Sequence, residues 1–437
     1  MRIAPKPLPT SRAAPPLRAP IPSAPPPRTA PAAAEVTLAS LSSQLAPLAG
    51  IAASSLAANI HDLDEGPFLS AGKNQFKSLW TRDFCWSVKG LLASGRSDVV
   101  KNQLDTLLGQ LQPGTHLLPR TLDTMDPKKR VLLASLSRVL PFIKPEQPLE
   151  GPLHPEYQDQ NGQIAIDGNA LAILATLDYV DATGDRAFLA AHQAELVEAL
   201  RFYDAHMQGG LVTQPPFSDW QDSVKREGAT FYTNVLYQRV LERLQGNPAF
   251  GITADQVQAH RQATDAAFFD ASTGMYRSVA GRPQVSLDGN LLAIDLGYLA
   301  PDSARAGAVY AAVKASPFWS RTGTPGFDTY PDYAATDRSL SVNLSGLGHY
   351  HDELQWSWLM ALSGKVAIEM GDLEGAHKSL GKLQQLAQRD GGIAEIYTAG
   401  AEAKPVSTLL YRSEQPFSWG AAYAVDALAT LARRAGA

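Results

Sequence analysis

The stretch Ile166-Asp-Gly-Asn-Ala-Leu-Ala-Ile173 returns 121 residues later in the chain as Leu287-Asp-Gly-Asn-Leu-Leu-Ala-Ile294. In each copy Asp-Gly-Asn stands just before an apolar run with helical spacing, where an Asp or Asn side chain can cap the free amide groups of a helix start. A match this short can also arise by chance. If the copies are equivalent, Asp167 and Asp288 lie at matching ends of inner helices in a ring of helical hairpins, and the loops at that rim build the functional site.

Helical spacing of apolar residues extends over most of the chain, whereas strand signals are few. The clearest ranges are 84–93, 98–111, 170–181, 188–206, 231–244, 253–269, 291–299, 304–315, 353–370, 373–388 and 419–434. Two more ambiguous ranges, 38–57 and 131–142, bring the total to about a dozen helices. This pattern predicts an all-α domain over residues 38–437, an (α/α)6 toroid in which paired helices alternate between an inner and an outer ring.

The N-terminal segment has a different composition from the rest of the chain. Its first 34 residues contain eleven prolines and no acidic residue, the first acid being Glu35. We predict a disordered, Pro/Ala-rich tail over residues 1–37. The prolines interrupt every candidate apolar segment of a secretory signal, and no run of 18 apolar residues occurs, so we expect a cytoplasmic protein that does not span a membrane.

Composition and motifs narrow the function classes. The chain has 437 residues, 45% hydrophobic residues and a net charge of −5, which is typical of a globular protein and unfavourable for binding nucleic acid. Cys85 is its only cysteine, which excludes internal disulfides and multi-cysteine zinc sites. Nucleotide-binding glycine loops and the His-Glu-x-x-His motif do not occur, so we expect no cofactor and no catalytic metal, although a calcium ion held by loop carboxylates stays possible.

Two distant acidic sites indicate the chemistry. Trp220-Gln-Asp222 places a carboxylate beside an indole, and about 170 residues later comes Gly392-Ile-Ala-Glu395-Ile-Tyr397. An aromatic face can pack on a pyranose ring while two carboxyl groups act as acid and base across a glycosidic bond. The alternatives are structural: Asp222 could cap a helix or pair with Lys225 or Arg226, and Glu395 could be an exposed loop acid.

A series of blocks in the same order resembles the amylo-α-1,6-glucosidase domain of glycogen debranching enzymes and related (α/α)6-barrel glycosidases. The resemblance covers about residues 76–430. Its blocks are Trp80-Thr-Arg82-Asp83, Asp167-Gly-Asn-Ala-Leu, Trp220-Gln-Asp222, His349-Tyr-His351-Asp-Glu353, Gly392-Ile-Ala-Glu395-Ile and Phe417-Ser-Trp419. The chain departs from the pattern at Asp352-Glu353, where relatives carry Asn-Gly, and in a proline-rich insertion at 126–156.

The resemblance implies an inverting glycoside hydrolase, with Asp222 as general acid and Glu395 as general base. Glu414, five residues before Trp419, competes for the role of base because glucoamylase-like enzymes use an acid in such a segment. We expect burial against Trp220 to raise the pKa of Asp222, and polar donors to keep Glu395 ionised. Inversion requires the two carboxyl groups to lie roughly 6.5–9.5 Å apart.

The substrate implied is an α-linked glucoside or a related oligosaccharide or polysaccharide. Arg82 and Asp83 can hold sugar hydroxyls or instead form structural ion pairs. Trp80, Trp86, Trp356 and Trp358 can be ring platforms or core residues, and we favour Trp80 and Trp356 for the site. The predicted binding residues are Trp80, Arg82, Asp83, Asp167, Trp220, His351, Glu353, Trp356 and Trp419. The residues expected at one mouth of the barrel are Arg82, Asp83, Asp167, Trp220, Asp222, Glu353, Glu395 and Trp419.

Two other function classes stay open at this point. One is a sugar epimerase or isomerase on the same fold, using His349 and His351 as an acid–base pair. The other is a glycan-binding barrel without catalytic activity. The sequence specifies neither the sugar and its linkage nor the oligomeric state.

Overall fold

A computed structural model describes residues 36–159, 162–316, 319 and 333–436. Most of the predicted tail, residues 1–35, lies outside the described residues. The first helix, α1 (Leu38–Ala57), begins where the sequence places the start of the domain. Thr37 caps it, because its side chain accepts a hydrogen bond from the amide of Ser40 while the Ser40 side chain accepts one from the amide of Thr37.

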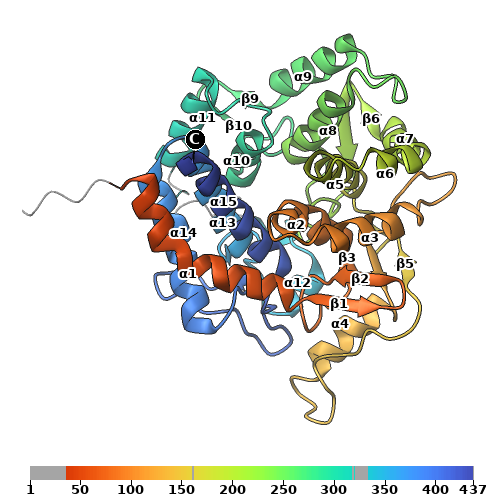
Figure 1. Cartoon of the computed structure of the whole chain (residues 1–437), viewed down its shortest axis with the longest axis vertical. Helices are drawn as coiled ribbons and strands as arrows, with labels where there is room; N and C mark the ends of the chain where they lie inside the picture. The colour runs from red at the N-terminus through yellow and green to blue at the C-terminus, as the bar shows by residue number, and fades with distance from the viewer. Residues whose placement is uncertain (1–35, 160–161, 317–318, 320–332, 437) are drawn as a thin grey trace, which may run out of the picture. The chain divides into compact units, whose positions relative to one another are not determined.

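Within the described residues, six helices contact one another in a closed cycle (Figure 1). In the order of the cycle they are α2 (Thr81–Ala93), α5 (Gly168–Thr183), α8 (Phe231–Leu244), α10 (Leu287–Asp295), α13 (Ser357–Glu369) and α15 (Ser418–Gly436), which contacts α2 again. Each contacts at least one outer helix; these are α1, α3 (Ser97–Leu108), α7 (Gln193–Arg201), α9 (Ala254–Phe268), α11 (Ala304–Ala315) and α14 (Leu373–Asp390). The chain therefore alternates between inner and outer positions.

The residues of the two kinds of helix match their positions. The inner helix α13 is buried along 357–368, without a polar stripe, as expected for a helix surrounded by others. The outer helix α14 instead buries one face, at Ala376, Leu380, Leu383 and Ala387. Removing this apolar surface from water is the main force that holds the two rings together.

Two glycines allow inner helices to pack closely. A Cβ atom at Gly90 of α2 would collide with the backbone of Ala422 in α15, and one at Gly420 of α15 would collide with the side chain of Ser357 in α13. The three helices therefore approach one another more closely than larger residues would permit, and this helps the cycle of helices to close.

The structure also contains short β-sheets, which the predicted all-α class does not include. Their strands are β1 (Ile60–Leu63) with β2 (Gly66–Leu69); β3 (Leu79–Trp80), β4 (Thr121–Asp123) and β5 (His154–Glu156); β6 (Met207–Gln208), β7 (Leu211–Gln214) and β8 (Gly228–Ala229); β9 (Phe269–Asp270) with β10 (Met275–Tyr276); and β11 (Gln355–Trp356) with β12 (Ile396–Tyr397). All pairings are antiparallel. Strands β3, β8 and β11 lead into α2, α8 and α13, so they gather where these inner helices begin. The predicted helix 353–370 consequently starts at Ser357, because Gln355 and Trp356 form β11.

The repeated Asp-Gly-Asn segments both begin inner helices, α5 and α10. The asparagines have the same role in the two copies, since the amide of Leu118 donates to Oδ1 of Asn169 (3.0 Å) and the amide of Tyr276 donates to Oδ1 of Asn290 (2.8 Å). Each asparagine ties the start of its helix to a preceding segment. Asp167, by contrast, makes no capping hydrogen bond, so the predicted cap is wrong for this residue.

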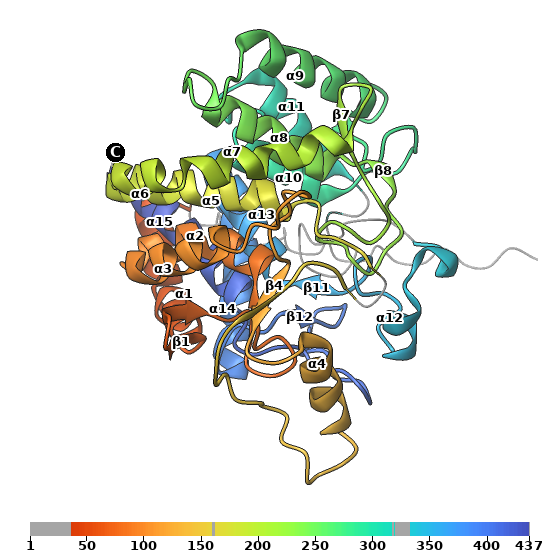
Figure 2. The ribbon, with the colours of Figure 1, turned by 90° about the vertical axis from the view of Figure 1, so that its right-hand side faces the viewer.

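The remaining short helices include α4 (Pro127–Leu136), α6 (Arg186–Ala191) and α12 (Leu340–Leu344). The view in Figure 2 shows α4 and α12 standing out from the ring on the side where β4, β11 and β12 lie. Among the described residues, none of the helices combines the length and the apolar character that a membrane crossing requires.

Candidate active site

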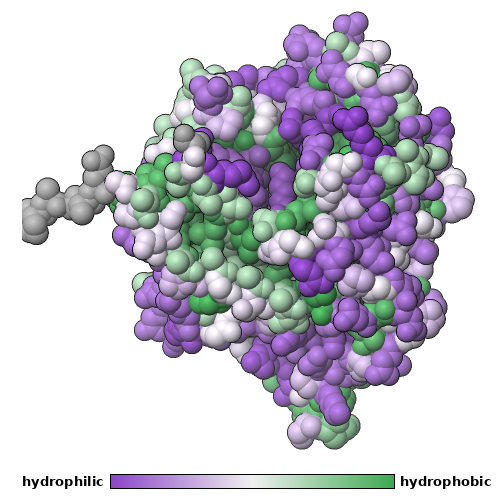
Figure 3. All heavy atoms as spheres, in the orientation of Figure 1, coloured by the Kyte–Doolittle hydropathy of each residue, from purple (hydrophilic) through white to green (hydrophobic). Residues whose placement is uncertain are grey.

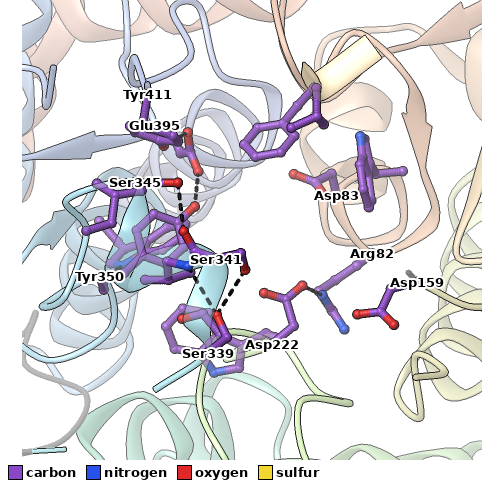
Figure 4. Close-up of a pocket in the computed structure, with 18 of the residues that line it drawn as sticks. Arg82, Asp83, Asp159, Asp222, Ser339, Ser341, Ser345, Tyr350, Glu395 and Tyr411 are labelled. Atoms are coloured by element: carbon purple, nitrogen blue, oxygen red, sulfur yellow. Dashed lines mark hydrogen bonds and ion pairs between the residues drawn. The ribbon is translucent and has the colours of Figure 1, made fainter. Parts of the chain in front are cut away.

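A cavity of about 310 Å³ is lined by residues from the segments before the inner helices and from α4 and α12. The predicted residues that line it are Trp80, Arg82, Asp83, Trp220, Asp222, Trp356, Glu395 and Trp419. Figure 4 shows Asp222 and Arg82 on one side of this cavity and Glu395 and Tyr411 on the other. The structure thus brings both predicted catalytic carboxyl groups to one space.

Asp222 is held by a chain of charges. Arg82, in the first turn of α2, donates to Asp167 from Nε (2.7 Å) and Nη2 (2.9 Å), and its Nη1 donates to Oδ2 of Asp222 (3.2 Å). The hydroxyl of Tyr232 donates to Asp167 as well (2.9 Å). Burial raises the pKa of Asp222, and the charge of Arg82 opposes this shift. The side chain of Asp222 nevertheless keeps 38% of its surface exposed within the cavity.

Arg82 and Asp83 do not form an ion pair with each other. The guanidinium group of Arg82 is bonded to Asp167 and Asp222 instead. Figure 4 shows the carboxyl group of Asp83 directed into the cavity. Burial raises the pKa of Asp83 to about 7, although Arg82 lowers it. Asp83 is therefore a third carboxyl group available to a ligand, and one that is partly protonated at neutral pH.

Glu395 is held by neutral hydrogen-bond donors. The hydroxyl of Tyr350 donates to its Oε1 (2.7 Å), the hydroxyl of Tyr411 to its Oε2 (2.6 Å) and the amide of Glu414 to Oε2 (3.3 Å). Burial raises the pKa of Glu395 to about 8, and the two tyrosine hydroxyls only partly oppose it. We expected polar donors to keep this residue ionised; the donors are present, but the loss of hydration outweighs them at neutral pH.

Glu414, the competing candidate for the base, has a different environment. Its Oε2 accepts hydrogen bonds from the amides of Lys73 and Asn74, both 2.9 Å, and its Oε1 accepts one from the amide of Phe76 (3.1 Å). The side chain is fully buried and is not part of the cavity lining. Glu414 therefore fixes the loop that brings Phe76 to the cavity wall.

Aromatic rings build much of the cavity wall. Trp220 packs edge-on against Trp356 (5.5 Å between centroids) and Trp358 (4.8 Å), and Trp358 stacks on Trp419 (4.4 Å). The indole N–H of Trp220 donates to Asp288 (2.6 Å), which fixes the ring. Trp358 and Trp86 do not line the cavity, whereas Trp80, Trp220, Trp356 and Trp419 do.

Three predicted binding residues lie outside the lining. Asp167 is fully buried and its carboxylate is bonded to Arg82. His351 is also buried, stacked on Trp356 at 5.3 Å, and burial together with the charges of Arg226 and Arg82 lowers its pKa well below the usual value. Glu353 is 43% exposed and contacts His349 at 3.4 Å. These three residues therefore do not line the cavity, although Asp167 is bonded to Arg82, which does.

Several lining residues were not predicted from the sequence, including Phe76, Arg120, Asp159, Tyr350 and Tyr411. Tyr350 stands inside the quoted block around His349 and His351, and its hydroxyl is the only polar atom of that side chain. No spacing rule links it to Glu395. Arg120 lies over the ring of Trp80, 5.1 Å from the centroid, where it contributes a cation–π contact to the wall.

The donor set of the site does not suggest a metal. Within the described residues, no group of three or more His, Cys, Asp or Glu side chains is placed to hold a metal ion. Oδ2 of Asp222 and both carboxylate oxygens of Glu395 instead accept hydrogen bonds from protein donors on opposite walls.

No protein-family model and no curated protein sequence matches this chain. Several solved structures do. A glycosidase in complex with glucose superposes with a TM-score of 0.62 at 17% identity, over 91% of this chain and 99% of its own. A rhamnosidase from Klebsiella oxytoca with rhamnose bound gives 0.59 at 14% identity, over 90% of this chain and 64% of its own.

A third solved structure is a metal-independent alpha mannosidase from Streptococcus pneumoniae, in a non-productive complex with alpha-1,6-mannobiose. It gives a TM-score of 0.58 at 11% identity and covers 90% of this chain and 97% of its own length. At identities this low, the likeness is one of fold. This chain therefore has the fold of these glycosidases.

Proposed function

We propose that this protein is an inverting glycoside hydrolase whose catalytic domain, residues 38–437, is an (α/α)6 toroid. The observation that carries the proposal is that Asp222 and Glu395, on separate segments of the chain, line one tryptophan-walled cavity from opposite sides. Two carboxyl groups across a cavity are the arrangement that hydrolysis of a glycosidic bond requires, and no cofactor is needed for it. The shared fold with three glycosidases supports this function.

Asp222 is the general acid and Glu395 the general base. A proton from Asp222 passes to the oxygen of the leaving group as the bond from this oxygen to the anomeric carbon breaks. Glu395 removes a proton from the water that attacks the same carbon from the other face. Tyr350 and Tyr411 hold both oxygens of Glu395, which fixes the direction of the carboxylate. Asp83, which lines the same cavity, binds a hydroxyl group of the sugar.

Glu395 is the better base of the two candidates because it lines the cavity. Glu414 has both carboxylate oxygens occupied by backbone amides of the 73–76 loop and does not reach the cavity. Its position supports a structural role.

The substrate we propose is an α-linked glucoside or a related oligosaccharide. The structural neighbours carry glucose, rhamnose and a mannobiose, which are all pyranoses, and the tryptophan wall suits the apolar face of such a ring. The likeness to debranching enzymes rests on the sequence blocks alone.

The two histidines do not support an epimerase. Burial lowers the pKa of His351 well below its usual value, so this residue stays neutral, and its ring is packed against Trp220 and Trp356. The side chain of His349 is 49% exposed and lies outside the cavity lining. The pair therefore lacks the access to substrate that proton transfer requires.

A panel of α-linked glucosides, mannosides and rhamnosides, followed by NMR at the anomeric proton, tests the function. We expect the β-anomer to form first from an α-linked substrate, and Glu395→Gln to abolish release while sugar binding persists. First formation of the α-anomer would contradict inversion. Binding without release by the wild-type protein would show a glycan-binding barrel without catalytic activity.

A further inference from the structure

The large apolar side chains that are exposed among the described residues gather on three segments. Their exposed fractions run from 44% to 81%, and they are Leu132, Val139 and Phe142 in and after α4, Leu340 and Leu344 in α12, and Leu409 in the loop after β12. We call these six residues the apolar rim. At the foot of Figure 3, apolar residues are visible on the protruding segment that carries α4.

Hydrogen bonds join the three segments to one another. The Arg138 side chain, next to Val139, donates to Oγ of Ser407 (2.8 Å) and to the carbonyl of Thr408 (3.0 Å). The hydroxyl of Thr408, next to Leu409, donates to the carbonyl of Ser345 (2.7 Å), which follows Leu344. The three segments that carry the apolar rim are therefore hydrogen-bonded to one another.

The same three segments also line the active-site cavity. Val131 of α4, Val342 and Ser345 of the α12 segment, and Tyr411 of the loop all contribute side chains to its wall. The helices α4 and α12 stand out beyond β11 and β12 (Figure 2). The rim residues therefore lie on the same segments as part of the cavity wall, although none of the six lines the cavity itself.

The chemistry of the rim favours one kind of occupant. A continuing sugar chain presents hydroxyl groups, and proteins bind these with aromatic rings and with hydrogen-bond donors and acceptors. The rim offers aliphatic side chains and one phenylalanine instead. Burying such side chains against an apolar group removes them from water, which is favourable.

We propose that the rim binds an apolar aglycone, so that the substrates are amphiphilic glycosides with an alkyl or other hydrocarbon group on the anomeric oxygen. This rests on the proposed hydrolase function. Water adds to the anomeric carbon, the bond between that carbon and the glycosidic oxygen breaks, and the aglycone leaves along the rim as a free alcohol. The proton that it gains comes from Asp222.

Methyl, n-butyl and n-octyl α-D-glucopyranosides test the proposal, with matching series of α-D-mannosides and α-L-rhamnosides. A fully buried methylene strengthens binding about fourfold, and an open rim buries only part of the chain. We expect kcat/KM to rise about ten- to hundredfold from methyl to octyl, mainly through KM, at concentrations below micelle formation. Equal kcat/KM along the series overturns the aglycone site while leaving the hydrolase function intact. Failure to cleave any glycoside overturns both.

Polar variants of the rim identify the residues. Leu344→Gln and Leu409→Gln each lower the octyl-to-methyl ratio of kcat/KM by at least about threefold, whereas the matched control Ala190→Gln, on an exposed position of α6, leaves the ratio unchanged. Sedimentation shows whether the rim is an interface between two copies. A wild-type dimer that becomes a monomer in Leu344→Gln would overturn the proposal in favour of such an interface. Rim-dependent binding to phosphatidylcholine vesicles would overturn it in favour of a membrane surface.

Discussion

Asp222 and Glu395 face the same cavity, but the two walls that hold them use different chemistry. Asp222 lies beside the guanidinium group of Arg82, which is shared with Asp167. Glu395 receives hydrogen bonds from two phenol groups and an amide, with no cation bonded to it among the described residues. A permanent cation favours the carboxylate of Asp222 and neutral donors favour that of Glu395, but at both groups the loss of hydration outweighs these partners and raises the pKa.

The different partners act on the pKa values of the two carboxyl groups. Burial raises the pKa of both, to about 8 for Glu395, and the opposing charge of Arg82 acts on Asp222. A base with a high pKa is a strong proton acceptor once ionised, but it is mostly protonated at neutral pH. Under the proposed mechanism Glu395 has to be ionised, so activity depends on the fraction of this group that has lost its proton.

The largest effects are expected from removing the two carboxylates. Glu395→Gln and Asp222→Asn each lower kcat about a hundred- to ten-thousand-fold on alkyl glycosides, because each removes a group that transfers a proton in the transition state. On nitrophenyl glycosides, whose leaving group needs little protonation, Asp222→Asn recovers much of its rate. Glu395→Gln does not, but it responds to added azide.

The reverse pattern would exchange the two roles. If Glu395→Gln is the variant that nitrophenyl substrates rescue, then Glu395 is the acid and its raised pKa serves that function. Circular dichroism and sugar binding of both variants serve as controls for folding.

Glu414→Ala tests the structural role of the third glutamate. It removes three hydrogen bonds between a buried carboxylate and backbone amides, so we expect the free energy of unfolding to fall by about 2–4 kcal/mol in urea denaturation. Glu374→Ala, at an exposed position of α14, is the matched control and leaves the unfolding curve unchanged. A stable Glu414→Ala variant without activity would instead make Glu414 a catalytic candidate.

The pH dependence of kcat/KM tests the surroundings of Glu395. As the proposed base, Glu395 acts only when ionised, so kcat/KM rises with pH towards about 8, the raised pKa of this group, over the range in which Asp222 keeps its proton. Tyr411→Phe removes a donor that favours the ionised form, which raises the pKa further. The rising limb then moves to higher pH, and kcat/KM at pH 7 falls about tenfold.

Tyr157→Phe is the control for the pH experiment, because the Tyr157 hydroxyl is bonded to the carbonyl of Gln110 outside the cavity lining. If the rising part of the kcat/KM profile lies at the same pH in Tyr411→Phe as in the wild-type protein, the group that titrates there is not Glu395.

The smallest effect is expected from His349→Gln. The imidazole is half exposed and does not line the cavity, so kcat/KM changes by less than about twofold in a standard assay with the best panel substrate. A loss of a hundredfold or more would point back to histidine acid–base chemistry.

Sequence patterns singled out several residues of the cavity lining because they mark local chemistry. Trp220-Gln-Asp222 and Glu395 were singled out by residue type and position, and both carboxyl groups line the cavity. The same reasoning placed His351 and Glu353 in the site, where neither lines the cavity. In the block around His349 and His351, the residue that contacts Glu395 is Tyr350. The sequence alone does not tell which side chain of a turn faces the site, because this depends on the path of the backbone.

The small sheets were missed for a similar reason. Strands of two to four residues, such as β3 and β11, are too short to show the alternation that predicts a strand. They form because antiparallel partners are supplied by segments far along the chain, as Gln355 pairs with Tyr397.

The sequence by itself determined the helical architecture, since apolar spacing is a local property that each helix carries within its own residues. It also determined which acids and tryptophans were available for chemistry. Only the tertiary structure decided what each acid does. Glu395 and Glu414 are 19 residues apart and both buried, yet one faces the cavity between two tyrosines and the other binds the amides of a loop more than 330 residues away. Burial and partners set the pKa and the access of a carboxyl group, and both arise from contacts between distant segments.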